Sequence, residues 1–140
     1  MMIRRAAPAD ADALRAVVAA AYAPFGHLDL PPVAEGLAED IRDHNVWVAE
    51  VAGIVRGGIV LILGAEAHIA NLAVHPEAGG QGIGRALIDT AVKAARAAGH
   101  LSVMLATHRD LGQTQAFYRK LGWVETGRDG VKVYLALRQD

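Results

Sequence analysis

Apolar residues recur along this chain at two different spacings, and each spacing predicts one kind of element. Where they return every three or four residues, the pattern is typical of a helix with one buried face. Between Pro8 and Pro24, for example, Leu14, Val17 and Val18 fall on one stripe. The predicted helices lie between Pro8 and Pro24, from Val33 to His44, from Leu87 to Ala98 and from Gly112 to Leu121.

Shorter apolar runs rich in valine and isoleucine predict strands. They cover Ile3 to Ala6, Val46 to Val51, Ile54 to Leu63, Ala67 to Val74, Ser102 to Ala106, Trp123 to Thr126 and Val131 to Leu137. Strands joined by a few residues pair antiparallel, whereas the helix between Val74 and Ser102 makes the strands beside it parallel neighbours. Gly57 and Gly58 inside a strand indicate a bulge or close packing. The pattern predicts one α/β domain over residues 1–140, with a mixed and mostly antiparallel sheet.

The segment that joins the strand ending at Val74 to the next helix is the most informative one. It contains Gly79-Gly80-Gln81-Gly82-Ile83-Gly84-Arg85, and no Ser, Thr, Asp or Asn is placed to cap the helix. The first N–H groups of a helix have no partner within it, and they carry the positive end of its dipole. Glycines let these groups turn inward and let a phosphate approach. The segment therefore predicts a pyrophosphate site, and a plain glycine-rich turn is the alternative.

Two known phosphate-binding loops differ from this segment. The Walker loop needs Lys followed by Ser or Thr, and Arg85-Ala86 stands there instead. The dinucleotide loop needs a third glycine where Leu87 stands, and it follows the first strand of its unit, whereas this loop lies in mid-chain. A strand, a glycine-rich loop without Lys and a helix fit the pyrophosphate of coenzyme A best. The side chain of Arg85 could bond a phosphate or pair with Asp89.

Three stretches make the chain resemble the GNAT superfamily of acetyl-CoA-dependent N-acetyltransferases. They are Asn71-Leu72-Ala73-Val74-His75-Pro76, Gly80-Gln81-Gly82-Ile83-Gly84-Arg85-Ala86-Leu87 and Ala116-Phe117-Tyr118-Arg119-Lys120-Leu121-Gly122-Trp123. Their order and spacing are also similar to the family, and the likeness spans nearly the whole chain. Two positions depart from the family pattern, because Gly79 stands where members usually carry Gln or Arg, and Leu111 where many carry Asn.

The resemblance implies a fold, a cofactor and a set of contacts. It implies a central, mostly antiparallel sheet with one splayed parallel strand pair, flanked by about four helices. In GNAT enzymes the pantetheine arm of acetyl-CoA lies in the gap between the splayed strands, much like an added strand. That would place the backbone of Leu72, Ala73 and Val74 along the arm. The loop from Gly79 to Arg85 would hold the pyrophosphate through its amides.

Tyr118 is the residue that we expect to take part in the chemistry. On a helix it lies about 100° from Phe117, so it can point toward the gap while Phe117 and Leu121 face the core. A departing thiolate needs a proton, and a tyrosine hydroxyl with a pKa near 10 still carries its proton at pH 7. The resemblance implies this general-acid role, because the matching tyrosine of GNAT enzymes has it. The alternative is a packing tyrosine bonded to a backbone carbonyl.

The acceptor side of the site is less well defined by the sequence. Tyr22 and Phe25 follow the first helix, in a connection that usually covers the acceptor pocket in GNAT enzymes, so they either line that pocket or cap the core. Asn71 and His108 lie close to the two central strands. His108 is the first choice for the base that takes the amine proton, and a structural role is the alternative. Further candidates for this base are Asn71, His75, His27, Asp29 and Glu66.

Composition narrows the function classes further. A net charge of −1, without a block of like charges, argues against a nucleic-acid partner. The chain has no cysteine, which excludes disulfides and a cysteine nucleophile, and no histidine spacing predicts a metal site. Neither a signal peptide nor a membrane-spanning stretch is visible. These features favour a cytoplasmic protein without a metal and without a membrane partner.

Together, the sequence predicts an N-acetyltransferase that moves an acetyl group from acetyl-CoA to a primary amine by direct attack in a ternary complex. The acceptor is a small-molecule or peptide amine. A non-catalytic acyl-CoA-binding sensor of the same fold is the alternative, favoured by the departures at Gly79 and Leu111 but not by the presence of Tyr118. Members of the family often pair through sheet edges or helix faces, so the resemblance also allows a homodimer.

Overall fold

The computed structural model describes residues 1–28 and 35–138, and within them it contains one seven-stranded sheet and four α-helices. The strands are β1 (Met2–Arg5), β2 (Asn45–Val51), β3 (Ile54–Leu63), β4 (Ala67–Val74), β5 (Ser102–His108), β6 (Val124–Asp129) and β7 (Lys132–Arg138). The α-helices are α1 (Ala11–Tyr22), α2 (Leu37–Asp43), α3 (Ile83–Ala97) and α4 (Gly112–Lys120). Short 3-10 helices are η1 (Pro8–Asp10), η2 (Ala23–Phe25) and η3 (Pro76–Ala78).

The strands lie in the order β1-β2-β3-β4-β5-β7-β6. Each neighbouring pair is antiparallel except β4 and β5, which are parallel. The connection between these two strands contains α3, whereas the antiparallel neighbours β2, β3 and β4 follow one another through short turns. The predicted mixed sheet with one parallel pair is therefore confirmed.

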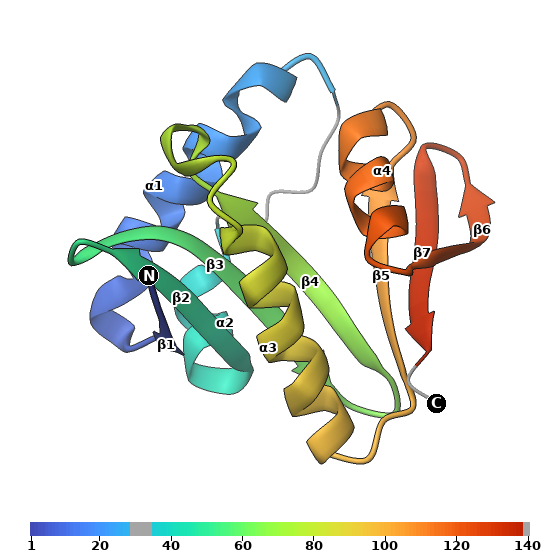
Figure 1. Ribbon diagram of the computed structural model, residues 1–140, viewed down its shortest axis with the longest axis horizontal. Helices are drawn as coiled ribbons and strands as arrows, with labels where there is room; N and C mark the ends of the chain where they lie inside the picture. Colours follow the sequence, from blue (N-terminus) through green and yellow to red (C-terminus); the bar gives the residue numbers. More distant parts are fainter. Residues whose placement is uncertain (29–34, 139–140) are drawn as a thin grey trace.

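The parallel pair is joined only at one end, and a bulge in β4 accompanies the separation. β4 and β5 pair at Ala67 opposite Val103 and at the residues that follow, and no further. The register of β3 against β4 shifts after Val60, which leaves Ala70 of β4 without an opposite residue. A bulge of this kind bends its strand. Figure 1 shows β4 and β5 diverging from their shared end, so the sheet is split down its middle.

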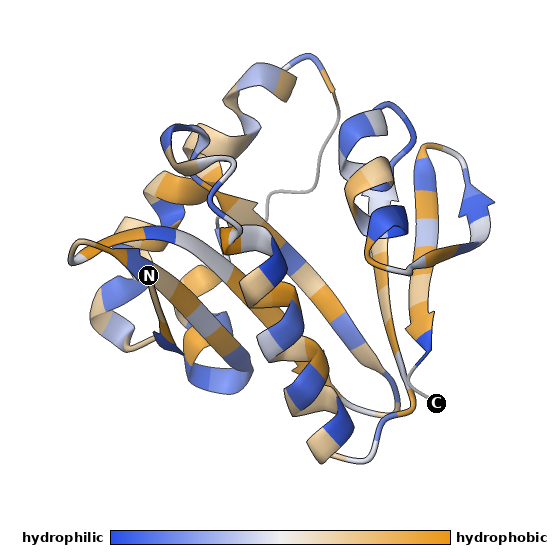
Figure 2. Cartoon of the chain, viewed as in Figure 1, coloured by the Kyte–Doolittle hydropathy of each residue, from blue (hydrophilic) through white to orange (hydrophobic). Residues whose placement is uncertain are grey.

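Helices cover both faces of the sheet. One face carries α3, whose buried side chains include Leu87, Ile88 and Ala91, and the opposite face carries α1 and α2 (Figure 1). Each of these helices turns apolar positions to the sheet and polar positions outward (Figure 2), because burying the apolar stripe is what holds a helix on a sheet. α4 packs on the α3 side, where Tyr118 and Trp123 join the same core cluster.

Several predicted boundaries need correction. α3 begins at Ile83 rather than Leu87, because a first turn that contains glycine scores poorly by propensity but is held by the burial of Ile83. The same helix ends at Ala97, and Ala98, expected on its apolar face, is exposed. β5 continues to His108, two positions past its predicted end at Ala106. The start of α2 was expected at Val33, which lies outside the described residues.

Gly57 and Gly58 let helices approach both faces of β3. A Cβ on Gly57 would lie 2.8 Å from Cγ2 of Ile83 in α3, and a Cβ on Gly58 would overlap the side chain of Leu14 in α1. Both neighbours are fully buried. The predicted close packing is confirmed, and it explains why two adjacent strand positions have no side chain.

We expect Gly58→Ala to lower the free energy of unfolding by about 1 to 3 kcal/mol, the usual cost of overpacking a core. Leu14 is surrounded by other core residues and cannot move aside without disturbing them. Urea denaturation of purified variants measures this. Gly64→Ala is the matched control, because a Cβ there meets nothing within 4 Å. Equal stability of the two variants would contradict the packing argument.

Candidate active site

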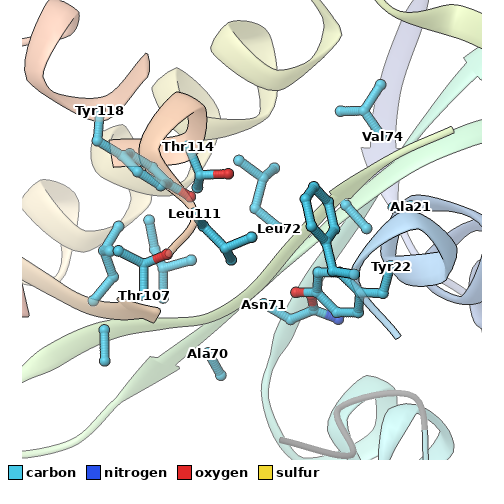
Figure 3. Close-up of a pocket in the computed structure, with 15 residues that line it drawn as sticks. Ala21, Tyr22, Ala70, Asn71, Leu72, Val74, Thr107, Leu111, Thr114 and Tyr118 are labelled. Carbon is cyan, nitrogen blue, oxygen red and sulfur yellow. The ribbon is translucent and has the colours of Figure 1, made fainter. Parts of the chain in front are cut away.

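The split between β4 and β5 opens into a cavity of about 190 Å³. One wall comes from the end of α1 and from η2, the floor from β4 and β5, and the other wall from Leu111 and α4 (Figure 3). The cavity brings together these residues that were predicted for the site: Tyr22, Phe25, Asn71, Leu72, Ala73, Val74 and Tyr118. Three parts of the chain that are far apart in the sequence, residues 21–25, 69–74 and 105–118, therefore meet at one place.

Tyr118 is deeply buried and still faces the cavity. Its side chain is 5% exposed, and its ring packs edge-to-face against Phe117 at 5.3 Å and Trp123 at 5.5 Å between centroids. Phe117 and Leu121 pack against the core as expected, but Tyr118 also belongs to the core cluster instead of pointing away from it. Figure 3 shows the hydroxyl end of Tyr118 directed into the cavity near Leu111.

The hydroxyl of Tyr118 makes no hydrogen bond to the residues that the structure describes. The alternative of a packing tyrosine bonded to a backbone carbonyl therefore has no support among them. Burial raises the pKa of Tyr118 well above its ordinary value, and the nearby Tyr22 adds to the rise. The hydroxyl thus keeps its proton at neutral pH and can donate it to a group in the cavity.

Tyr22 in the wall from α1 and Asn71 in the adjoining floor form a polar pair across the cavity from Tyr118. The hydroxyl of Tyr22 donates a long hydrogen bond of 3.4 Å to Oδ1 of Asn71. Asn71 is 7% exposed and follows the bulge in β4. Burial raises the pKa of Tyr22, as it does for Tyr118. Phe25 completes this wall from η2.

The floor of the cavity offers backbone groups of β4. On one side, Leu72, Ala73 and Val74 pair with β3. On the other side, within the described residues, β4 has no strand partner beyond His68. The backbone of this stretch is therefore free on the edge that faces the gap, as an added extended chain would require.

The glycine-rich segment ends at an uncapped helix start. Gly80 and Gly82 both have φ of +78°, the left-handed region that favours glycine, and Gly82 is the N-cap of α3. The first helical bond runs from the N–H of Ala86 to the carbonyl of Gly82. From Gly80 to Arg85, no backbone N–H donates to an acceptor in the described parts of the chain. These groups fit an anion.

The uncapped start of α3 adjoins the cavity. A Cβ on Gly84 would lie 3.4 Å from the ring of Phe117 and 3.7 Å from Cγ2 of Val74, and Val74 lines the cavity. Arg85 is exposed, and within residues 1–28 and 35–138 it forms no ion pair with Asp89. Its guanidinium is therefore available to an anion at the same helix start.

His108 does not line the cavity. It is buried at the end of β5, where its Nδ1 accepts a hydrogen bond of 3.0 Å from the N–H of Asp110, and its carbonyl accepts one from Gln115. These bonds fix the connection between β5 and α4. His75 caps η3 in a similar way by accepting from the N–H of Glu77. We therefore leave both histidines out of the proposed site.

The remaining candidates for the base also lie elsewhere. His27 and Glu66 are not among the residues that line the cavity, and Asp29 lies outside the described residues. Within the described residues there is no group of three or more side chains that could hold a metal ion. In the same part of the chain, no helix has the length and apolar character needed to cross a membrane.

Part of the cavity lining, including two polar residues, was not predicted from the sequence. Thr107 was missed because β5 was expected to end at Ala106, whereas the strand continues to His108. Thr114 lies one helical turn before Tyr118, a spacing that places both on one side of α4. The other missed lining residues are apolar: Ala21, Ile69, Ala70, Leu105, Ala106 and Leu111.

A family profile matches the stretch of sequence that contains β4, the glycine-rich segment and α4. The profile described as Acetyltransferase (GNAT) domain matches residues 42–125, which is more than half of the chain. The chain therefore belongs to the GNAT acetyltransferase family. No match was found among curated proteins.

Solved structures share the fold over nearly the full length. PaiA N-acetyltransferase from Thermoplasma acidophilum, solved in complex with coenzyme A, has a TM-score of 0.88 at 22% identity, with 98% of each chain covered. Ard1 from Thermoplasma volcanium has a TM-score of 0.80 at 24% identity, covering 99% of this chain and 97% of that one. The ribosomal-protein-S18-alanine N-acetyltransferase from Escherichia coli reaches 0.80 at 20%, covering 98% and 92%. The predicted GNAT fold is confirmed.

Proposed function

We propose that this member of the GNAT family is an N-acetyltransferase, which transfers the acetyl group of acetyl-CoA to a primary amine by direct attack in a ternary complex. The observation that carries the proposal is the run of unpaired N–H groups at the start of α3, next to a cavity into which Tyr118 points. Acetyl-CoA requires both features side by side, because its diphosphate would bind the N–H groups and its thioester would lie in the cavity.

The residues present fit coenzyme A. The amides from Gly80 to Arg85, together with the guanidinium of Arg85, would hold the diphosphate, because helix starts and left-handed glycines present N–H groups to anions. The free edge of β4 from Leu72 to Val74 would pair with the amide groups of the pantetheine arm. When bound, acetyl-CoA would supply a thioester carbonyl to the cavity.

Tyr118 is the proposed acid of the reaction. The amine nitrogen forms a bond to the carbonyl carbon, the carbon–sulfur bond breaks, and the sulfur takes a proton from the hydroxyl of Tyr118. The proton that the nitrogen loses restores the hydroxyl, so that one amide and one thiol are formed. Direct attack requires only that both substrates be held together, which is a proximity effect.

Tyr22, Phe25 and Asn71 form the proposed acceptor side. Tyr22 and Asn71 lie across the cavity from Tyr118, and Phe25 lines the same cavity, so an amine bound by Tyr22 and Asn71 would lie across from the acid. The aromatic rings supply apolar contact, and the Tyr22–Asn71 pair supplies hydrogen-bonding groups. A site with these walls can orient a single amine toward the floor.

An assay of thiol release from acetyl-CoA tests the proposal. With a panel of primary amines, we expect amine-dependent release of thiol and an acetylated product of matching mass. Calorimetry with acetyl-CoA is measured in parallel. The second candidate, a non-catalytic acyl-CoA-binding sensor, would bind acetyl-CoA in this measurement but release no thiol with any amine. The replacement of the family's usual residues by Gly79 and Leu111 is the observation that favours this candidate. Absence of acetyl-CoA binding would contradict both.

A further inference from the structure

We infer that the acceptor is a weakly basic amine that enters the cavity uncharged, and that it carries an amide group beside the amine, as an α-amino amide does. This inference rests on the proposed function. It concerns the chemical class of the acceptor, which follows from the charge, burial and hydrogen bonding of the wall opposite Tyr118.

Every side chain that lines the cavity in the described part of the chain is uncharged. The polar groups are the hydroxyls of Tyr22, Tyr118, Thr107 and Thr114 and the carboxamide of Asn71. Hydroxyl and amide groups can accept a hydrogen bond from an amine, but they do not balance a full positive charge. An ammonium group would therefore lose its water here without gaining a counter-ion.

The cavity already disfavours charge on the groups it contains. Burial raises the pKa of Tyr22 and of Tyr118, which means that both prefer their neutral forms. The same physics acts with the opposite sign on an amine, because burial penalises the ammonium form and lowers the amine pKa. An amine that is already largely neutral in water enters at the lowest cost.

Among the residues that the structure describes, the elements around the cavity supply no side chain that readily takes the amine proton at neutral pH. The titratable side chains of the lining are Tyr22 from α1 and Tyr118 from α4, and both keep their protons. β4 and β5 contribute Asn71 and Thr107, while the Nδ1 of His108 is already bonded. The rate at low substrate concentration should therefore follow the neutral fraction of the amine itself.

The carboxamide of Asn71 favours an amide beside the amine. One end of this group pairs with Tyr22, and the other end has no hydrogen bond within the described residues. That end is Nδ2, and because Asn71 lines the cavity, Nδ2 can donate to an acceptor placed there. A carbonyl oxygen next to the amine would accept a hydrogen bond from this Nδ2 group. An α-amino amide has this group, and the same group lowers the pKa of its amine to about 8, against about 10.4 for an alkylamine.

A matched pair of amines tests the inference. Alaninamide and sec-butylamine have similar sizes, and kcat/KM is measured for both at pH 7.5 and pH 9.5. From the neutral fractions we expect kcat/KM to rise about fourfold for alaninamide and about 90-fold for sec-butylamine. Alaninamide should be the better substrate at pH 7.5. Circular dichroism and acetyl-CoA calorimetry at each pH confirm that the enzyme is unchanged.

Two results would overturn the inference while leaving the proposed function intact. One is a kcat/KM for sec-butylamine that equals or exceeds that of alaninamide at pH 7.5. The other is a kcat/KM for sec-butylamine that is flat between the two pH values. If neither amine, nor any other in the panel, is acetylated although acetyl-CoA binds, the proposed function itself fails.

Where alaninamide is a substrate, a tripeptide with a free N-terminus distinguishes two sources of an α-amino amide. A higher kcat/KM for the tripeptide than for alaninamide indicates a polypeptide end, and a lower one indicates a small molecule.

A carboxylate placed in the same wall should reverse the preference. Asn71→Asp supplies a counter-ion and a proton acceptor, so we expect kcat/KM for sec-butylamine relative to alaninamide to rise about tenfold at pH 7.5. Asn45→Asp is the control, since it makes the same change on β2 beside Arg5, away from the cavity. If a folded Asn71→Asp protein has the same ratio of kcat/KM for sec-butylamine to kcat/KM for alaninamide as wild type, the absence of charge in the cavity does not determine which amine is preferred. The wild-type comparison remains decisive if that variant does not fold.

Discussion

Replacing Tyr118 with phenylalanine is expected to lower kcat for acetyl transfer about 100-fold, with little change in the affinity for acetyl-CoA. The substitution removes one hydroxyl and keeps the ring that packs against Phe117 and Trp123. Because that hydroxyl has no hydrogen bond to the described residues, its loss should not lower stability. Steady-state kinetics and acetyl-CoA calorimetry measure the two quantities.

Tyr134→Phe is the matched control for this prediction. Tyr134 lies on β7, opposite Ala106 of β5, and is not among the residues that line the cavity. Loss of its hydroxyl should leave kcat within about twofold of wild type. An unchanged kcat in Tyr118→Phe would reject the acid role and would leave Tyr118 as a core residue that happens to border the cavity.

The burial of Tyr118 raises the pKa of its hydroxyl, and this determines when the hydroxyl can donate its proton. Its raised pKa keeps the hydroxyl protonated over the whole neutral range, so proton donation does not switch off below pH 9. The same rise makes complete transfer to a thiolate, with a pKa of about 8.5, unfavourable unless the proton from the amine replaces it at once. Tyr118 is therefore suited to donate while the carbon–sulfur bond breaks and to be restored in the same event.

The pattern of apolar residues predicted helices and strands well where it kept a single period from one end of the element to the other. The bounds of β3 and β4 were predicted to the residue, since long runs of apolar and β-branched side chains are bounded by Ala52-Gly53 and Gly64. The start of α3 was misplaced because glycine has a low helix propensity and no capping side chain marks where the helix begins.

The site could be predicted in its parts but not in its geometry. The glycine segment, Tyr118 and the backbone of β4 each had a local signal. The pairing of Tyr22 with Asn71 had none, because it joins residues 49 positions apart through a bend that depends on a bulge at Ala70. His108 lies outside the cavity lining, and its position near the end of a strand does not reveal that Nδ1 accepts a bond from the next turn.

Substituting Gly82 with aspartate is expected to weaken coenzyme A binding about 100-fold, equivalent to about 2.7 kcal/mol. Gly82 is the N-cap of α3, and a Cβ there meets nothing within 4 Å, so the side chain has room. Aspartate is among the residues that best tolerate a left-handed conformation. Its carboxylate would accept bonds from the same N–H groups that are proposed to hold the diphosphate, and it would repel the diphosphate itself.

Gly82→Asn separates charge from shape in this prediction. Asparagine has the same size and the same capping ability, but no charge, so we expect its effect on the dissociation constant to be about tenfold or less. S-acetylpantetheine, which lacks the diphosphate, should react equally well with both variants and with wild type. If calorimetry instead gives equal affinities for coenzyme A in Gly82→Asp and wild type, the start of α3 is not the diphosphate site. The unpaired amides from Gly80 to Arg85 would then need another partner.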